Sequence, residues 1–252
     1  MEPRTLAENE LDLALAAELQ AALLPSQCPE HCPNQQAAAL NRMCGSVGGD
    51  FHDFLRLNDE QTAIVIGDCV GHGVRAALLM AQIMGLLRSR PAYASRPEKM
   101  VSELNRMLLD LGERTGSTML CSIFYAVIDL PSGVGFFVNA GHPVPLLCDR
   151  RKCSTLRWST RNFMLGVKEF ELLEFCHTFR PGERMVLFTD GLVDASNVEG
   201  ERFGDSRLHE IIGRCVNASP NDCARSVFDE VAAFRNGSPQ TDDETIVVID
   251  RV

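Results

Sequence analysis

One short connection constrains the fold of this chain more than any other feature. Two apolar segments, residues 121–130 and 134–140, are separated only by the tripeptide Pro-Ser-Gly at 131–133. A parallel crossover needs a dozen or more residues, so these two strands must pair in antiparallel fashion. The sequence therefore predicts an antiparallel sheet and argues against a doubly wound parallel one.

Further hairpins and helices are predicted around this pair of strands. Apolar segments at 51–57 and 62–67 flank Asn-Asp-Glu at 58–60 and predict a second hairpin. Strands that arrive in hairpins, with helices in grouped pairs, indicate an α+β architecture. The other predicted strands are 144–148, 171–179, 184–189 and 244–250, and the predicted helices are 6–24, 74–87, 98–111, 208–215 and 223–234. The helix at 74–87 is apolar nearly all round, which predicts burial, and Gly112 is the expected end of the helix at 98–111.

The N-terminal segment is predicted to be separate from the body of the protein. Leucines recur at three- and four-residue steps from Leu6 to Leu24, with acidic residues between them, and Pro25 ends the helix. Residues 25–36 are rich in Pro, Cys, Gln and Asn, so we expect a helix and linker at 1–36 and a body at 37–252. The apolar stripe of the helix either packs on its own domain or pairs with another chain, as a homodimer or with a regulatory partner.

Charge and composition exclude several classes of protein. The 24 Lys and Arg residues against 34 Asp and Glu residues give a net charge of −10, which argues against a sequence-independent nucleic-acid binder. No apolar run is long enough to span a membrane and no signal peptide is evident, so we expect a cytoplasmic protein with no membrane partner. In such a compartment the ten cysteines stay reduced. A zinc site at Cys28, His31, Cys32 and Cys44 is disfavoured because the spacing lacks a second paired knuckle.

Four places put aspartate beside glycine or at the end of a predicted strand. They are Gly49-Asp50, Gly67-Asp68, Asp190-Gly191 and Asp242-Asp243. Carboxylates supply the hard oxygen ligands that suit Mg²⁺ or Mn²⁺, and glycine lets the backbone turn sharply beside them. Each pair alone reads as an ordinary turn, so the prediction of a metal site depends on the whole set.

Seven ordered motifs give the chain a specific resemblance. They are VGGDFHDF (47–54), GDCVGHGVRAALLMA (67–81), NAGHP (139–143), LGV (165–167), TDGLVDASN (189–197), RFG (202–204) and DDETIVV (242–248). With these motifs the chain resembles the SpoIIE/RsbU-type serine phosphatases, a bacterial branch of the metal-dependent PPM protein phosphatases. The resemblance implies an α-β-β-α sandwich of two antiparallel sheets and a centre of two Mn²⁺ or Mg²⁺ ions.

The resemblance also implies individual roles for the motif residues. Asp50 and Asp68 would bind metal, with Asp68 bridging both ions, and Cys69 would contribute its backbone carbonyl. Asp190 and Asp242 would complete the shell of the second ion, while Asp243, Gly49 and Gly191 would support the ligands. The chain departs from the family pattern at His52, where an aromatic residue, often tyrosine, is usual, and at Cys69-Val70.

The implied reaction is hydrolysis of a phosphoserine or phosphothreonine ester by a metal-activated water. His72 and His142 stand in motif-like contexts from which a proton donor for the leaving group could come. The structural alternatives are that His72 lies at the start of the following helix and that His142 fixes a loop by hydrogen bonds. By resemblance, the substrate is a phosphorylated STAS-type anti-sigma-factor antagonist or a similar signalling protein of sigma-factor and stress regulation.

Two other functions compete with this hypothesis. Gly48-Gly49-Asp50-Phe51 resembles the GG(D/E)EF loop of diguanylate cyclases, but that loop has one more residue and gives no role to the aspartates at 190 and 242. The second alternative is a catalytically silent phosphatase-like module that binds a partner. Loss of a metal-binding carboxylate would be typical of such a module, and all four are present here.

Overall fold

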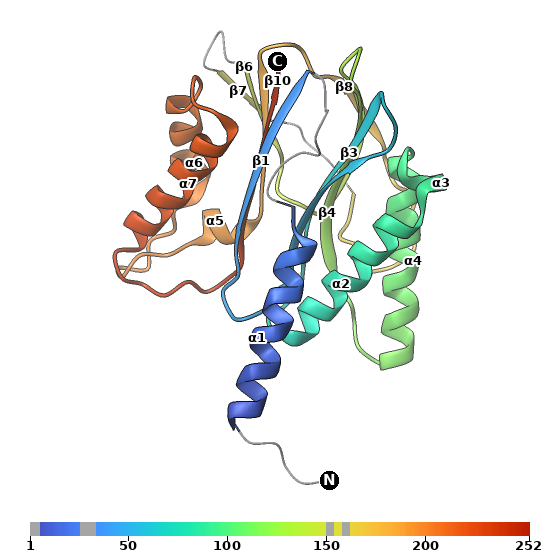
Figure 1. Cartoon of the computed structure of the whole chain (residues 1–252), viewed down its shortest axis with the longest axis vertical. Helices are drawn as coiled ribbons and strands as arrows, with labels where there is room; N and C mark the ends of the chain where they lie inside the picture. Colours follow the sequence, from blue (N-terminus) through green and yellow to red (C-terminus); the bar gives the residue numbers. More distant parts are fainter. Residues whose placement is uncertain (1–5, 26–33, 150–153, 158–161) are drawn as a thin grey trace.

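Two antiparallel sheets form the centre of the protein (Figure 1). The computed structural model describes residues 6–25, 34–149, 154–157 and 162–252. The first sheet has the strand order β1-β10-β9-β6-β7 and the second has the order β2-β3-β4-β5-β8. The first contains β1 (Gln35–Arg42), β6 (Leu146–Asp149), β7 (Ser154–Arg157), β9 (Glu183–Phe188) and β10 (Glu244–Arg251). The second contains β2 (Asp50–Arg56), β3 (Gln61–Cys69), β4 (Cys121–Asp129), β5 (Val134–Ala140) and β8 (Phe175–Thr178).

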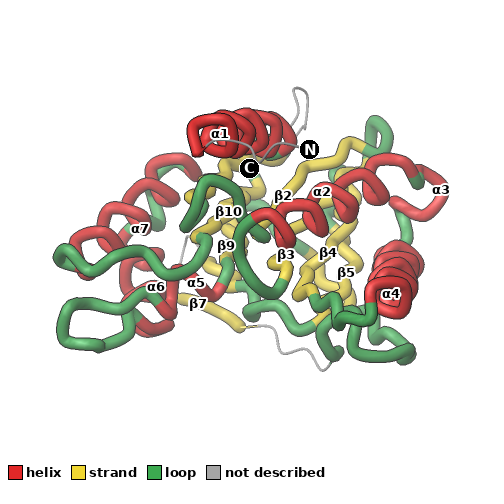
Figure 2. Tube along the Cα trace, turned by 90° about the horizontal axis from the view of Figure 1, so that it is seen from below, coloured by secondary structure: helices red, strands yellow, loops and turns green. Residues whose placement is uncertain are grey.

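Helices cover the outer face of each sheet, as the view from below in Figure 2 shows. The second sheet is covered by α2 (Val74–Ser89), α3 (Pro91–Ala94) and α4 (Pro97–Thr115). The first sheet is covered by α5 (Asp190–Asp194), α6 (Gly204–Arg214) and α7 (Pro220–Arg235). The four layers confirm the α-β-β-α sandwich predicted by the resemblance.

Three apolar cores hold these layers together. One lies between the two sheets and includes Ile64, Phe124 and Val247. The other two lie between each sheet and its helices, with Met80 and Leu104 on one side of the molecule and Leu208 and Val227 on the other. Each sheet therefore buries both faces, which explains why β3, β4 and β10 read as nearly continuous apolar segments.

Both predicted hairpins are confirmed, but two statements about helices are wrong. The helix expected to end at Gly112 continues to Thr115, because Gly116 is the residue with a left-handed conformation (φ 63°) that caps it. The helix expected to be buried all round, α2, leaves Val74 and Leu78 exposed on the side that faces away from the second sheet. Its buried face is formed by Ala76, Leu79, Met80, Ile83, Met84 and Leu87.

Several short elements differ from the sequence prediction. β1 begins at Gln35, two residues before the expected start of the body, because it pairs along its whole length with β10. The strand expected at 171–179 is reduced to β8 at its second half. The strands β1 and β7 and the short helices α3 and α5 were not predicted. Of the disfavoured zinc cluster, residues 28, 31 and 32 lie outside the described part of the chain, and the Cys44 thiol donates a hydrogen bond to the carbonyl of Gln240.

The N-terminal helix α1 (Leu6–Leu23) lies at the edge of the sandwich, near β2 and α2. Its N-terminal end projects beyond the sheets (Figure 1). Leu11, Leu15 and Leu19 are all exposed, so these three leucines do not pack on the helix's own domain. Among the described helices, none has the length and apolar character required to cross a membrane.

Candidate metal centre

The predicted site residues meet at one end of the two sheets. Asp50 is the first residue of β2 and Asp68 is near the end of β3, and the two are direct partners in the antiparallel pairing. Asp190 follows β9 at the start of α5, and Asp242 lies just before β10. The second sheet thus supplies one pair of carboxylates and the first sheet supplies the other pair.

Asp50 ties the two sheets together at this point. Its side chain is buried, and Oδ2 accepts hydrogen bonds from Thr189 Oγ1 (2.7 Å) and Thr245 Oγ1 (2.5 Å). The backbone N–H of Thr245 in turn donates to Thr189 Oγ1 (2.9 Å). Burial, and then the charge of Asp68, raise the pKa of Asp50 well above its usual range, while the two threonine hydroxyls oppose this shift.

The pKa of Asp68 is affected by the carboxylates from the other sheet. Burial raises its pKa to about 7, and the charges of Asp190, Asp242 and Asp243 add to the effect. The pKa of Asp190 is also raised, first by burial and then by Asp194, and the pKa of Asp242 is raised chiefly by burial. In the part of the chain that the structure describes, no Lys or Arg side chain forms an ion pair with Asp50, Asp68, Asp190 or Asp242.

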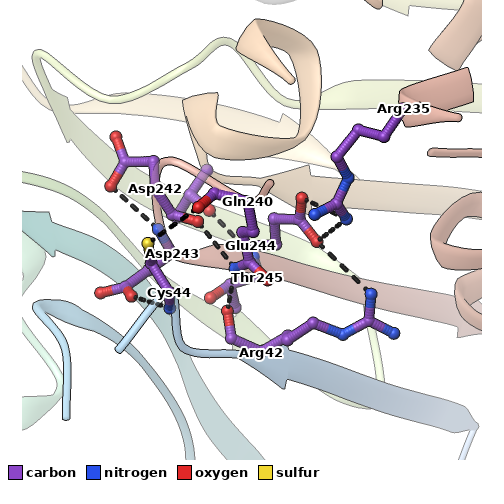
Figure 3. Close-up of polar contacts among 9 residues, drawn as sticks. Arg42, Cys44, Arg235, Gln240, Asp242, Asp243, Glu244 and Thr245 are labelled. Atoms are coloured by element: carbon purple, nitrogen blue, oxygen red, sulfur yellow. Dashed lines mark hydrogen bonds and ion pairs between the residues drawn. The ribbon is translucent and has the colours of Figure 1, made fainter. Parts of the chain in front are cut away.

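Asp243 faces a different direction from its neighbour Asp242 (Figure 3). Its Oδ1 accepts a hydrogen bond from the N–H of Cys44 (2.7 Å), and its Oδ2 accepts one from the N–H of Gly49 (2.7 Å). A longer contact of 3.4 Å joins Oδ2 to the N–H of Asp50. Asp243 thus fixes the loop that leads into β2, a geometry suited to supporting the ligands rather than to binding an ion.

The two predicted glycines are required by close backbone approach. A Cβ atom on Gly49 would lie 2.5 Å from the carbonyl oxygen of Cys69, and one on Gly191 would lie 2.0 Å from the carbonyl oxygen of Asp243. Real Cβ atoms do not approach so closely, and the obstacles are backbone atoms that have no freedom to move aside. Any larger residue would therefore displace a segment that carries a predicted ligand.

Cys69 and Cys121 are buried cross-strand partners in β3 and β4. A hydrogen bond with the Cys121 thiol, together with burial, raises the pKa of the Cys69 thiol well above its usual range. The thiol is therefore protonated and packed in the core. Only the backbone carbonyl of Cys69, beside Gly49, remains as a group for the site.

The two candidate histidines lie in contrasting environments. His142 is buried, which lowers its pKa to about 3, and its Nδ1 forms a hydrogen bond with Ser122 Oγ (2.8 Å). Asn139 Oδ1 accepts from the N–H of His142 (2.9 Å), so this histidine is neutral and fixes a loop. His72 is exposed in the loop between β3 and α2, close enough to Asp242 for its positive charge to favour the ionised carboxylate. His72 therefore fits a proton donor better than His142 does.

The arrangement fits hard divalent cations that take only some of their ligands from the protein and the rest from water. Within the described residues, no three His, Cys, Asp or Glu side chains form a closed cage around one point. Mg²⁺ typically keeps several waters and needs only one or two carboxylates, so a closed cage is not required. Four carboxylates without an arginine or lysine partner would repel one another, and added positive charge would stabilise them.

Sequence reasoning missed Thr189 and Thr245, which orient Asp50. Both lie inside motifs that the sequence singled out, TDG at 189–191 and DDET at 242–245. For Thr189, a hydroxyl next to the predicted ligand Asp190 was the available signal.

Comparison with known proteins places this geometry in a family. Protein IcfG of Synechocystis sp. (strain ATCC 27184 / PCC 6803 / Kazusa) is 26% identical over 267 residues, which cover 96% of this chain and 42% of that protein. Phosphoserine phosphatase RsbU of Bacillus subtilis (strain 168) is 23% identical over 247 residues, covering 97% of this chain and 71% of RsbU. The chain thus spans less than half the length of IcfG.

Solved structures share the fold. The SiaA-PP2C domain of Pseudomonas aeruginosa superposes with a TM-score of 0.84 at 21% sequence identity, covering 98% of this chain and 99% of that domain. The family model described as Stage II sporulation protein E (SpoIIE) matches residues 58–252. Because this match covers well over half of the chain, the protein belongs to the SpoIIE family.

Proposed function

We propose that this protein is a Mn²⁺- or Mg²⁺-dependent phosphatase that hydrolyses phosphoserine or phosphothreonine on another protein. The observation that carries the proposal is the convergence of Asp50, Asp68, Asp190 and Asp242 at one end of the sandwich, without an arginine or lysine partner in the described structure. Family membership and the name of RsbU, a phosphoserine phosphatase, support the same reaction class. Clustered negative charges repel a phosphate group, so binding a phosphoprotein at this place requires added cations.

The proposed ligands are the four carboxylates and the backbone carbonyl of Cys69. By the resemblance of its motif, Asp68 would be the ligand shared by two ions, and the charges of Asp190 and Asp242 act on it from the first sheet. Asp243, Gly49 and Gly191 support the ligands through the contacts described above. When bound, two divalent ions supply a water with a pKa near neutrality and positive charge opposite the phosphoryl oxygens.

Side chains of this protein would orient the metal ligands and protonate the leaving group. Thr189 and Thr245 hold the Asp50 carboxylate in one rotamer, which keeps it opposite Asp68. His72, exposed beside Asp242, is the proposed donor of a proton to the serine oxygen that leaves. Positioning and electrostatics account for most of the catalysis of phosphoryl transfer, so no side-chain nucleophile is needed.

The substrate class follows from the resemblance of the motifs and is part of the proposal. It is a phosphorylated STAS-type anti-sigma-factor antagonist or a similar signalling protein. The exposed leucines Leu11, Leu15 and Leu19 on α1 support a second proposed contact, either with another copy of this chain or with a regulatory partner. A catalytically silent binding module remains the competing function, and the presence of all four carboxylates disfavours it.

A phosphatase assay tests the proposal. We expect wild-type protein to hydrolyse p-nitrophenyl phosphate and a phosphoserine protein in Mn²⁺ or Mg²⁺ and to be inactive in EDTA. Asp68→Asn should lower kcat/KM by roughly 10²- to 10⁴-fold, because loss of the bridge removes several kcal/mol of charge stabilisation. The exposed candidate acid is tested by His72→Asn. The matched control is His142→Asn, which changes the buried neutral histidine. Activity that persists in EDTA, or wild-type protein that binds the phosphoprotein without turnover, would contradict the proposal.

A further inference from the structure

Two helix ends flank the second sheet at the candidate metal centre. Residues 70–73 join β3 to α2, and residues 116–120 join α4 to β4. Because both links are short, the first turn of α2 and the last turn of α4 lie at the end of the sheet that carries Asp68 (Figure 1). Asp68 pairs with Ser122 on the neighbouring strand, and Met119 lies three residues before Ser122. From the usual strand spacing and rise per residue, Met119 is roughly 10 Å from Asp68.

An open groove lies between the last turns of α4 and the loop at 165–167. Its volume is about 320 Å³, and its lining includes Leu109, Glu113, Met119 and Val167. The loop is the LGV motif, which supplies no proposed metal ligand. This motif instead forms one wall of a groove that begins beside the candidate metal centre.

The wall formed by the LGV loop is firmly held. Leu165 exchanges two backbone hydrogen bonds with Cys121, the first residue of β4 (2.9 and 3.2 Å). The buried side chain of Asn105 on α4 accepts a hydrogen bond from the N–H of Gly166 (2.8 Å) and donates one to the carbonyl oxygen of Lys168 (3.0 Å). Gly166 has a φ of 84°, a left-handed conformation that favours glycine. The groove is therefore preformed, which lowers the entropic cost of binding a ligand.

Arg75 borders the groove from the first turn of α2. Its Nη2 donates to the carbonyl oxygen of Thr118 (3.3 Å) and to Met119 Sδ (3.5 Å), so the side chain reaches across to the link before β4. Among the described residues Arg75 has no ion-pair partner, and its Nε and Nη1 donate to no protein atom. The helix dipole disfavours a cation in the first turn of a helix. The stability of α2 thus does not account for an arginine at this position.

The segment around Arg75 is positive in an acidic protein. Residues 69–97 contain four arginines and no acidic residue, whereas the whole chain has a net charge of −10. A local positive surface favours acidic partners and speeds their encounter. Val70 and Val74 in this segment and Val167 on the groove are also exposed, and exposed apolar side chains close together are typical of protein-binding surfaces. Charge and apolar surface together indicate an acidic protein segment as the ligand.

We propose that this groove binds the segment of a phosphoprotein substrate that flanks its phosphoserine, and that Arg75 binds an acidic side chain of that segment. The inference rests on the proposed function, because it places the phosphoserine at the candidate metal centre. An extended chain spans at most about 3.3–3.6 Å per residue, so the roughly 10 Å between Asp68 and Met119 corresponds to about three residues. The acidic residue is therefore expected two to four positions from the phosphoserine.

Two phosphoserine peptides test the role of Arg75 in full-length protein at saturating Mn²⁺. One peptide carries aspartates two to four positions from the phosphoserine on both sides, and the other carries asparagines there. We expect wild type to show a lower KM for the aspartate peptide. Arg75→Ala should raise that KM about three- to five-fold, the size expected of an exposed charged contact, and leave kcat unchanged. The KM values for the asparagine peptide and for p-nitrophenyl phosphate should stay within two-fold of wild type.

Glu113 provides a matched control of opposite charge, because it lines the same groove. Glu113→Gln should leave the KM for the aspartate peptide unchanged or lower it, and Arg75→Lys should restore part of the preference that Arg75→Ala loses. Binding without turnover is measured by fluorescence anisotropy of labelled peptides in which a non-hydrolysable phosphonate replaces the phosphate. The dissociation constant of the aspartate peptide should rise three- to five-fold in Arg75→Ala. Val167→Asp should weaken binding of both peptides, since it puts a negative charge on the wall of the groove.

The possible outcomes separate the docking groove from the proposed function. Wild-type protein that hydrolyses neither peptide nor p-nitrophenyl phosphate in Mn²⁺ overturns the proposed function itself. Wild-type protein that is active but treats the two peptides alike, or hydrolyses only p-nitrophenyl phosphate, overturns the docking groove alone. An equal loss of activity by Arg75→Ala on all three substrates also overturns it, because Arg75 would then act on the phosphoryl group or on the fold.

Discussion

Two groups of carboxylates lie in the same β-sandwich, but only one of them is neutralised by basic side chains. Asp250 on β10 faces Arg184 on β9, and both are buried. Arg184 donates from Nε to Asp250 Oδ1 (2.6 Å) and from Nη2 to Oδ2 (2.8 Å), a bidentate pair. Arg184 Nη1 and Nη2 also donate to the carbonyl oxygens of Cys215 and Ala218.

The carboxylates at the other group have no such partner in the described structure. The Asp50 side chain accepts hydrogen bonds from neutral threonine hydroxyls, and the charge that shifts its pKa most is that of another carboxylate, Asp68. Asp53 and Glu244 follow the pattern of Asp250, since each forms an ion pair with an arginine. The comparison teaches that arginines neutralise Asp250, Asp53 and Glu244, whereas the four carboxylates of the candidate metal centre have no arginine or lysine partner in the described structure.

The largest expected effect comes from breaking the paired group. Asp250→Ala should lower the free energy of unfolding by about 3–5 kcal/mol, because it leaves the buried Arg184 guanidinium without a counter-charge. Asp68→Asn, measured in EDTA, should leave the free energy of unfolding unchanged or raise it, because it removes a repulsion. Urea unfolding followed by circular dichroism measures both. Equal destabilisation by the two substitutions would show that Asp68 is also a structural acid.

Added metal should stabilise wild-type protein more than Asp68→Asn. Mn²⁺ at a hundred times its dissociation constant should stabilise wild-type protein by about 2.7 kcal/mol, since the ion binds the folded state and not the unfolded one. In a chain of this length that corresponds to a rise in Tm of roughly 5–11 °C. Asp68→Asn should lose most of this rise, which thermal unfolding at several Mn²⁺ concentrations would reveal. A rise of the same size in Asp68→Asn would place the ion elsewhere.

Much of the fold could be predicted because hairpins leave local marks in the sequence. The Pro-Ser-Gly connection predicted the pairing of β4 with β5, and the structure confirms it. β1 could not be predicted because Gln35 and Gln36 followed by alanines resemble a linker. That strand exists because β10, at the other end of the chain, provides its hydrogen-bonding partner. Its formation is a tertiary effect that no local pattern encodes.

The candidate site could be predicted in its carboxylates but not in their supports. Asp50, Asp68 and Asp190 stand beside glycine in the sequence, whereas the roles of Thr189 and Thr245 depend on the two sheets meeting. For α1 the sequence left two alternatives for the leucine stripe, and the exposure of Leu11, Leu15 and Leu19 excludes packing on the body for these residues. Gln20, in contrast, is buried, and its side-chain amide forms hydrogen bonds with the N–H and the carbonyl oxygen of Gly48. This contact joins residues far apart in the sequence, so no local pattern predicts it.

The smallest expected effect is a dependence of metal-free stability on pH. The pKa of Asp68 is about 7 in the folded protein, well above the value of about 3.9 in an unfolded chain. The folded state therefore binds more protons between these values, so the contribution of Asp68 to stability is present at low pH and is lost as the pH rises toward 7. Buried His52 and His142, with pKa values lowered to about 4 and about 3, act in the opposite direction below pH 6.5.

The effect of Asp68 is consequently isolated as the difference between wild type and Asp68→Asn, because both proteins contain the two histidines. In EDTA, the free energy of unfolding of wild type relative to Asp68→Asn should fall by up to about 1 kcal/mol per pH unit between pH 5 and 7, and become constant above pH 8. Saturating Mn²⁺ should abolish this slope in wild type, because a bound cation favours the ionised carboxylate. A difference that does not vary with pH in EDTA would mean that Asp68 is already ionised without metal, and the contrast with the arginine-paired acids would then lose its electrostatic basis.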